Sequence, residues 1–129
     1  MLVVFLAVPA LQRSSRNNQR EADATKVTAA MSSCISNRNG EVTSCDTVAK
    51  LENTGGLDQK KLQQLTTVTN ATSVAAANTV PNENTINFIF GAKCSKDTSA
   101  AEASTSSRQG AVVYRIETTG TAVNKCIDV

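Results

Sequence analysis

Four cysteines are the residues of this 129-residue chain whose type and spacing could do chemistry. They stand at positions 34, 45, 94 and 126, in a chain with three phenylalanines, one tyrosine and no tryptophan. An even number of cysteines in a small domain favours disulfide bonds, and disulfide bonds imply an oxidising compartment. Three pairings are open; proximity in the sequence favours Cys34 with Cys45, which leaves Cys94 with Cys126.

Two other roles for these thiols are alternatives. Four thiolates could ligate zinc, but structural zinc sites take cysteines in close pairs separated by only a few residues. No two cysteines here are closer than eleven positions, which disfavours zinc. Free thiols in a cytosolic protein are the second alternative, and a thiol count without reductant distinguishes them from disulfides.

The remaining polar residues argue against catalysis. The chain has no histidine, which removes the usual acid or base at neutral pH and the commonest metal ligand. Its eleven acidic residues are scattered, and the sequence has no glycine-rich phosphate loop, nucleophile elbow or calcium loop. We therefore expect a structural or binding protein, with no catalytic residue, no metal and no cofactor. The formal net charge of +2 provides no general attraction for nucleic acid or an anionic membrane.

The chain begins with an apolar segment, residues 1–8, followed by Pro9 and Leu11. As a helix eight residues cover about 12 Å, whereas a bilayer span takes about 20 residues. No basic region precedes the segment, so it is a poor signal peptide. We expect it to be the end of a longer apolar segment, with Met1 an internal or added residue.

Residues 10–35 predict one helix, because they contain no glycine or proline and many good helix formers. Residues 12–21 are polar all round and are expected to protrude from the globule, with their arginines on a solvated face or at lipid headgroups. We therefore divide the chain into a stem, 1–35, and a head, 36–129. The C-terminal half of the helix carries an apolar stripe for packing on a core: Ala22, Ala24, Val27, Ala30, Met31, Cys34 and Ile35.

Two short helices are expected next. Asp46 is the predicted N-cap of the first, which runs through Leu51 and ends at Gly55 and Gly56. Asp58 is the predicted N-cap of the second, on which four apolar residues share a side. Residues 69–84 are expected to be a surface connection, and the acceptor pattern for N-glycosylation at 70–72 a chance match. The four apolar residues are Leu57, Leu62, Leu65 and Val68.

The C-terminal third predicts β-structure. Large apolar residues recur at every second position over 86–90 and 112–116, which is typical of half-buried strands. They are Ile86, Phe88 and Phe90, which alternate with Asn87 and Ile89, and Val112, Tyr114 and Ile116, which alternate with Val113, Arg115 and Glu117. A turn at 118–121 and a third strand at 122–128 would complete a hairpin over 111–128. Residues 95–109 are expected to form an exposed loop. The fold class is therefore α+β: a long N-terminal helix on a small antiparallel sheet of three to four strands, tied by disulfides.

One stretch of the sequence resembles a known family. The run Phe5-Leu6-Ala7-Val8-Pro9-Ala10-Leu11-Gln12-Arg13-Ser14 is similar to the stem of type IV pilins. It resembles most the pilins of ultrasmall, host-attached bacteria, where the proline is followed by Leu-Gln-Arg-Ser and a helix rich in Arg, Asn and Gln. The match covers about residues 2–26; the rest agrees in layout. The cleavage signature and the glutamate near the mature N-terminus are not in this sequence, so neither role is assigned, and the loop between Cys34 and Cys45 is additional to the family pattern.

The resemblance implies a structural subunit of a type IV pilus filament, with adhesion or twitching motility as its role. Its partners would be other copies of itself, the pilus assembly machinery, the membrane before assembly and possible host-cell surfaces, with nucleic acid only through DNA uptake. The implied location is the cell-surface pilus, after passage through the inner or cytoplasmic membrane. Cys94 and Cys126 would bracket the family's C-terminal loop. The assembly stem would comprise Leu2, Val3, Val4, Phe5, Leu6, Val8, Pro9 and Leu11.

Two further functions are alternatives. One is a minor pilin or a pseudopilin of type II secretion, which would share the fold but work in low copy number. The other is a secreted, disulfide-tied binding domain unrelated to pili.

Overall fold

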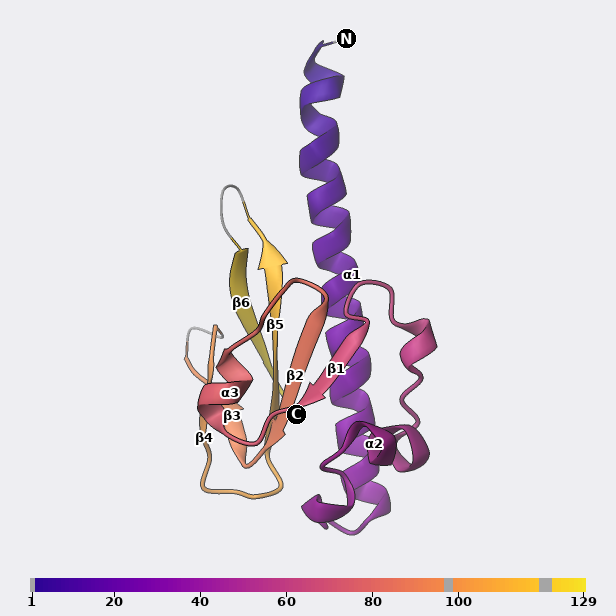
Figure 1. The fold of residues 1–129 in the computed structure, drawn as a ribbon, viewed down its shortest axis with the longest axis vertical. Coiled ribbons are helices and arrows are strands. Elements are labelled where there is room, and N and C mark those ends of the chain that lie inside the picture. The colour runs from indigo at the N-terminus through magenta and orange to yellow at the C-terminus, as the bar shows by residue number, and fades with distance from the viewer. Residues whose placement is uncertain (1, 97–98, 119–121) are drawn as a thin grey trace.

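In a computed structural model, the chain forms one long helix beside a four-stranded sheet (Figure 1). The structure describes residues 2–96, 99–118 and 122–129, with side chains from residue 11 onward. The helices are α1 (Leu2–Asn37), α2 (Val48–Gly55) and α3 (Val74–Asn78). The strands are β1 (Thr67–Asn70), β2 (Thr85–Phe90), β3 (Ala92–Cys94), β4 (Ala101–Ala103), β5 (Gly110–Glu117) and β6 (Ala122–Asp128).

Helix α1 has 36 residues, about 54 Å, and is longer than the predicted 10–35. Its C-terminal half packs on the sheet, and its N-terminal part extends past the β5–β6 hairpin (Figure 1). The predicted apolar stripe is buried, except that Ala22 is exposed and Ile35 is half-buried. The fully buried members of the stripe are Ala24, Val27, Met31 and Cys34.

Helix α2 lies across the C-terminal end of α1. Its N-cap is Thr47, whose hydroxyl accepts from the backbone N–H of Lys50 at 3.2 Å; the predicted cap, Asp46, instead pairs with the Lys50 ammonium. Gly56 ends α2 in the left-handed conformation, as the sequence predicts. Gly55 allows the two helices to approach, because a Cβ there would lie 2.3 Å from the carbonyl oxygen of Ala30.

The second predicted helix does not form. Asp58 does act as an N-cap, but only for a 3-10 turn at Gln59–Lys61. Beyond that turn, the carboxylate of Asp23 on α1 accepts the backbone N–H groups of residues 63, 64 and 65 at 2.6–3.1 Å. N–H groups bound to this carboxylate are not available for helical bonds, so the chain extends here. The four apolar residues predicted to share a helix side still enter the same core, three from the loop and Val68 from β1.

The main sheet has the strand order β1-β2-β5-β6. Strand β5 is antiparallel to both of its neighbours, β2 and β6, and the β5–β6 hairpin lies in the region 111–128 that the sequence predicts. Its turn residues 119–121 lie outside the described residues. Strand β1 is parallel to β2, so the expectation of a wholly antiparallel sheet is wrong. The parallel pairing requires a crossover, and residues 71–84 supply it through α3. They are most of the predicted surface connection 69–84, whose first two residues belong to β1.

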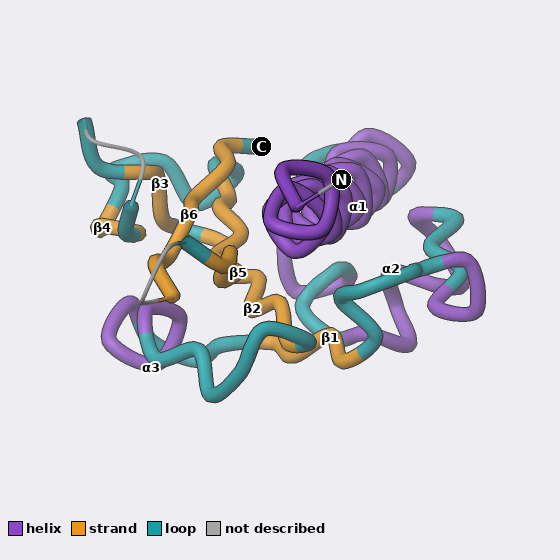
Figure 2. The backbone as a smooth tube through the Cα atoms, turned by 90° about the horizontal axis from the view of Figure 1, so that it is seen from above, coloured by secondary structure: helices purple, strands orange, loops and turns teal. Residues whose placement is uncertain are grey.

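Both faces of the sheet are covered, which corrects the prediction of half-buried strands. Helices α1 and α2 lie on one side, while α3 and the β3–β4 pair lie on the other (Figure 2). On β5, Val112 and Tyr114 enter the core under α1, while Ala111 and Val113 enter the opposite core. Asn87 of β2 is buried as well, and its amide donates to backbone carbonyls at the C-terminal end of α3.

The predicted loop 95–109 also contains regular structure. Strand β4 pairs antiparallel with β3 to form a separate two-stranded sheet. The side chain of Asn78 fixes β4 to α3, because it accepts from the N–H of Ala101 at 2.7 Å and donates to the carbonyl of Ala101 at 3.0 Å. Residues 105–108 remain exposed, as the sequence predicts for the loop.

The Asp23 carboxylate provides a test of this fold. It is 1% exposed and accepts backbone N–H groups from three consecutive residues. Replacing it by alanine leaves these donors without their acceptor, and we expect a loss of about 2–4 kcal/mol in the free energy of unfolding. Urea denaturation measures the loss. The control, Asp58→Ala, removes an exposed cap and should cost about 1 kcal/mol; equal losses for both would contradict this role of Asp23.

Candidate assembly site: the stem and its junction with the head

The predicted assembly stem coincides with the N-terminal part of α1. The backbone of residues 2–10 is helical and continues through Pro9 without interruption. Their side chains lie outside the described part of the structure, so of the predicted stem side chains only Leu11 is placed. It is 67% exposed, the most exposed large hydrophobic residue in the described part of the chain.

The stem joins the head through polar contacts at the end of β5. Asn17 of α1 pairs with the backbone of Glu117: its amide donates to the carbonyl at 2.7 Å, and its carbonyl oxygen accepts from the N–H at 2.9 Å. Arg16 donates to the Glu117 carboxylate from two nitrogens, at 2.8 and 2.9 Å. The side chain of Asn17 thus bonds both backbone groups of Glu117, and the arginine adds a charge-assisted bond.

Arg20 is the buried member of this junction, at 3% exposure. Its guanidinium donates to the backbone carbonyl of Glu83 and to the side-chain oxygen of Asn17, both at 3.0 Å. It also lies 3.5 Å from the Glu117 carboxylate. A buried cation needs such partners, because its desolvation is otherwise very costly. We call Arg16, Asn17, Arg20 and Glu117 the junction cluster.

The junction cluster corrects the prediction that residues 12–21 protrude from the globule with their arginines on a solvated face, because Arg20 is buried and Arg16 and Asn17 bond to the head. Positions 16, 20, 24 and 27 recur at helical spacing, so the polar residues continue the buried apolar stripe of α1 toward the N-terminus. The helical spacing of these positions is visible in the sequence and could have indicated that Arg16 and Arg20 face the head. The partner residue Glu117 was not identifiable, because it comes from a strand about a hundred positions away.

Two disulfides tie the head. Cys34 at the end of α1 bonds Cys45, and Cys94 of β3 bonds Cys126 of β6. These are the pairs that sequence proximity favours. In the chain-entropy model they contribute about 3 and about 4 kcal/mol to stability. Two disulfides indicate an oxidising environment, such as the extracellular space.

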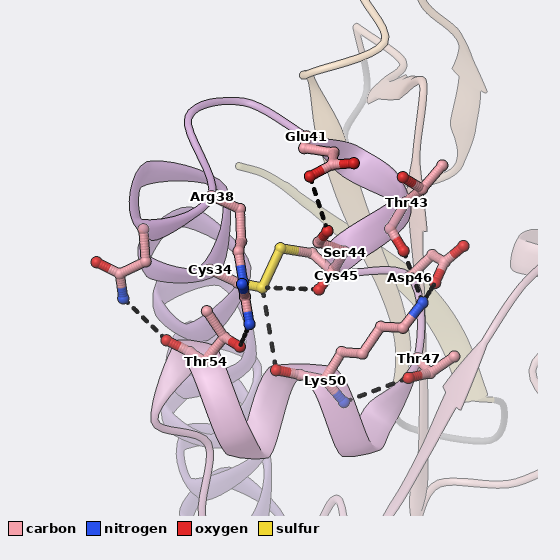
Figure 3. The surroundings of a disulfide bond; sticks show 11 residues. Cys34, Arg38, Glu41, Thr43, Ser44, Cys45, Asp46, Thr47, Lys50 and Thr54 are labelled. Atoms are coloured by element: carbon pink, nitrogen blue, oxygen red, sulfur yellow. Dashed lines mark hydrogen bonds and ion pairs between the residues drawn. A yellow bond between two sulfur atoms is a disulfide. The ribbon is translucent and has the colours of Figure 1, made fainter.

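Polar contacts surround the first disulfide (Figure 3). The Lys50 ammonium donates to the Asp46 carboxylate at 2.9 Å and to the Thr43 carbonyl at 2.6 Å, which holds the loop that carries Cys45 against α2. Asn37 and Arg38 donate to Thr54 at the other end of α2. The C-terminal end of α1 is therefore attached to α2 on both sides of the disulfide.

The second disulfide fixes the C-terminal part of the chain. The Asp128 carboxylate on β6 accepts from the backbone N–H of Cys94 at 2.6 Å, beside the bond between Cys94 and Cys126. Together they join the two-stranded sheet to the main sheet. The segment between these cysteines contains β4 and the exposed residues 105–108.

A groove of about 410 Å³ lies between α1 and the β5–β6 hairpin. Asn17, Asn18 and Glu21 line its helix side, and Ile116 and Ile127 are among the residues on its sheet side. Tyr114 also lines the groove. Burial raises the pKa of Tyr114 to about 12, and the negative charge of Glu21 adds to the rise. The phenol therefore stays neutral in any physiological condition.

Among the described residues, no group of three or more Cys, Asp or Glu side chains is placed to hold a metal ion. Within the described ranges, no helix has both the length and the apolar character needed to cross a membrane.

Comparison of the chain with protein-family models, with curated proteins and with solved structures found no match. The resemblance to type IV pilins therefore rests on the sequence of residues 2–26. The coarse architecture, a long N-terminal helix with a small sheet and disulfides, is compatible with it.

Titration of the single tyrosine tests the groove. Its unfolded-state pKa is about 10, so the folded state favours the neutral phenol. Its contribution to stability is complete below pH 10 and is lost as the pH rises from about 10 to about 12. Ultraviolet absorbance of the phenolate follows Tyr114 directly, since the chain has no tryptophan and no other tyrosine. We expect Glu21→Gln to lower the pKa only slightly, because burial is the larger cause; an ordinary pKa near 10 would show that the phenol is solvated.

The junction cluster predicts a dependence of stability on acid. Hydrogen bonding from Arg16, with the charges of both arginines, lowers the pKa of Glu117 from 4.5. Its contribution is therefore present above pH 4.5 and is lost as the pH falls through the lowered value. Glu117→Gln should cost about 1 kcal/mol at pH 7 and reduce this acid dependence. Thermal unfolding at pH 7 and below pH 4.5 measures both effects. The control is Glu102→Gln, which breaks an exposed pair with Lys93. Equal losses of stability in the two variants would contradict the prediction.

Proposed function

We propose that the protein is a structural subunit of a type IV pilus filament on the cell surface, supporting adhesion or twitching motility. The observation that carries the proposal is α1, a single helix with its C-terminal half in the core of the head and its N-terminal part extending beyond it (Figure 1). The extending part has the apolar sequence that resembles the pilin stem. Other copies of the chain would be the main partners.

Burial of the stem would drive assembly. An apolar helix segment in water gains about 1.5–3 kcal/mol for each large side chain that becomes buried. Six of the first eight residues are leucine, valine or phenylalanine: Leu2, Val3, Val4, Phe5, Leu6 and Val8. Stems packed together in the axis of a filament would bury them, and a membrane would cover them before assembly.

The junction cluster supports the same role. A filament subunit needs a stem that keeps a constant direction relative to its head, because each copy must dock in the same way. Arg16, Asn17 and Arg20 bond to Glu117 and Glu83 at the level where α1 leaves the sheet. These contacts hold the helix against the head up to the start of the free part.

The disulfides support a location outside the cytoplasm. Both lie in the head or at its border with α1, where they restrain loops that would face solvent in a filament. The pilus assembly machinery would export the subunit, and the exposed residues 105–108 would be available to a host-cell surface.

Immunogold electron microscopy on source cells, with antibody against residues 36–129, tests the proposal. Label along thin surface filaments is the expected result. Label only at filament tips or bases would indicate a minor pilin or a pseudopilin of type II secretion. Label only in the medium would contradict a filament subunit and favour a secreted, disulfide-tied binding domain.

Charged substitutions in the apolar segment of the stem test whether this segment drives assembly. Phe5→Glu or Leu6→Glu places a carboxylate in the segment that assembly would bury, and we expect filaments to disappear. Thr105→Glu, on an exposed part of the head, is the matched control and should leave filaments intact. Electron microscopy counts the filaments, and a thiol count checks that both disulfides still form. Normal filaments from the stem variants would show that this segment is not the assembly element.

A further inference from the structure

The two-stranded sheet of β3 and β4 buries little apolar surface against the rest of the head. Each of its strands has three residues, and of their side chains only Ala92 and Ala101 are buried. Both enter the core on the α3 side of the main sheet. The hydrophobic gain is proportional to the apolar area removed from water, so an alanine methyl contributes much less than a leucine or phenylalanine side chain. Apolar packing alone therefore holds this small sheet weakly.

A few polar bonds and one disulfide attach the β3–β4 sheet to its surroundings. Asn78 of α3 bonds both backbone groups of Ala101, and the Asp128 carboxylate accepts from the backbone N–H of Cys94. Hydrogen bonds of this kind add little net stability, because water offers the same groups alternative partners when the sheet moves away. The covalent link from β3 to the main sheet is the bond between Cys94 and Cys126 of β6.

The β3–β4 sheet covers one face of the main sheet without taking part in the core under α1. Strand β3 lies against β5 and β6. Val113 of β5 is 0% exposed and Ile89 of β2 is 7% exposed, and both share their core with Ala92 and Ala101. The core under α1, which contains Met31 and Phe88, includes no residue of β3 or β4. Loss of the small sheet would therefore uncover the α3 side of the main sheet and leave the α1 side packed.

The two disulfides differ in how far solvent can reach them. Cys34 and Cys45 are 0% exposed, and the carbonyl oxygens of Ser44 and Lys50 lie 3.6 and 4.0 Å from the Cys34 sulfur (Figure 3). Cys126 is 5% exposed, whereas Cys94 is half-buried and is the most exposed of the four cysteines. Thiol–disulfide exchange requires a thiolate to reach one of the two sulfurs. The bond to Cys94 is therefore the accessible one.

We propose that the bond between Cys94 and Cys126 is a redox latch on the head. A dithiol reductant breaks it before the bond between Cys34 and Cys45, and the β3–β4 sheet then separates from β5 and β6. Helices α1 and α2 and the main sheet stay folded, because the core under α1 has no side chain from β3 or β4. The open form exposes apolar side chains of β2 and β5. The latch does not depend on the proposed filament function.

Opening of the latch is an exchange in two steps. A thiolate of the dithiol attacks the sulfur of Cys94 and forms a mixed disulfide, while the Cys126 sulfur leaves as a thiolate and takes up a proton from water. The second thiolate of the dithiol attacks the mixed disulfide and releases the Cys94 sulfur, which is protonated in the same way. The protein disulfide gains two electrons, and the dithiol is oxidised to its own disulfide. Oxidation of the two cysteines reverses the exchange and closes the latch.

Timed reduction of the purified full chain tests which bond breaks first. Dithiothreitol is added at a pH near 8, where thiolates form, the released thiols are alkylated, and peptide mass spectrometry follows each cysteine. We expect Cys94 and Cys126 to be released about tenfold faster than Cys34 and Cys45, or more, because access limits the exchange. In concentrated urea this difference should largely disappear. Equal rates in the folded protein, or earlier release of Cys34 and Cys45, would overturn the latch.

Hydrogen exchange tests what the broken bond releases. In the variant Cys94→Ala with Cys126→Ala, residues 92–103 should exchange at short times like an unfolded segment, while 24–34 of α1 and 112–116 of β5 stay protected. The matched control, Cys34→Ala with Cys45→Ala, should keep 92–103 protected at these times. The unmodified chain, reduced only at Cys94 and Cys126, repeats the measurement without substitutions.

Two results of the exchange measurement would overturn the latch. Rapid exchange of 24–34 and 112–116 together with 92–103 would show that the bond between Cys94 and Cys126 maintains the whole head. Continued protection of 92–103 after the bond is broken would show that the β3–β4 sheet stays in place without it.

Discussion

The structure depends on the burial of one side of α1 against the sheet. Ala24, Val27 and Met31 are buried in the core that this side of α1 shares with the sheet, together with Phe88 from the middle of the sheet. Because α1 is a single rigid helix, this packing also sets the direction of everything N-terminal to it. The position of the stem, the junction cluster and the groove between α1 and the β5–β6 hairpin all follow from where the helix lies on the sheet.

Polar side chains fix the arrangement of helices and strands around a small apolar core. The chain has three phenylalanines and no tryptophan, so its core is built largely from small aliphatic residues. Asn17 and Asn78 each bond both backbone groups of one residue in a strand, at β5 and β4. Asp23 and Asn87 bind backbone groups inside the protein. Such bonds add little net energy one by one, but leaving the buried groups unpaired would be costly. They make the arrangement of the elements specific.

Adjacent regions of α1 serve different roles, and the boundary is near the junction cluster. C-terminal to the junction cluster the helix is part of the head, with its polar face in solvent and its apolar face in the core. N-terminal to the junction cluster the helix leaves the sheet and carries the exposed Leu11. A helix anchored so firmly at one end transmits the orientation of the head to whatever its other end packs against. This is the property that a repeating subunit with a single stem requires.

The sequence by itself determined the long helix, the last three strands of the main sheet and the pairing of nearby cysteines. Each of these depends on local signals: an uninterrupted run of helix formers, alternation of apolar residues, or short separation along the chain. It also predicted which leucines near residue 60 are buried, although it assigned them to the wrong element. Only the tertiary structure decided the rest. Asp23 holds residues 63–65 out of a helix, β1 lies parallel to β2, and Arg20 is buried beside Glu117. In each case the deciding partner lies far away in the sequence, so the competition between local and long-range bonds is settled only when the chain has packed.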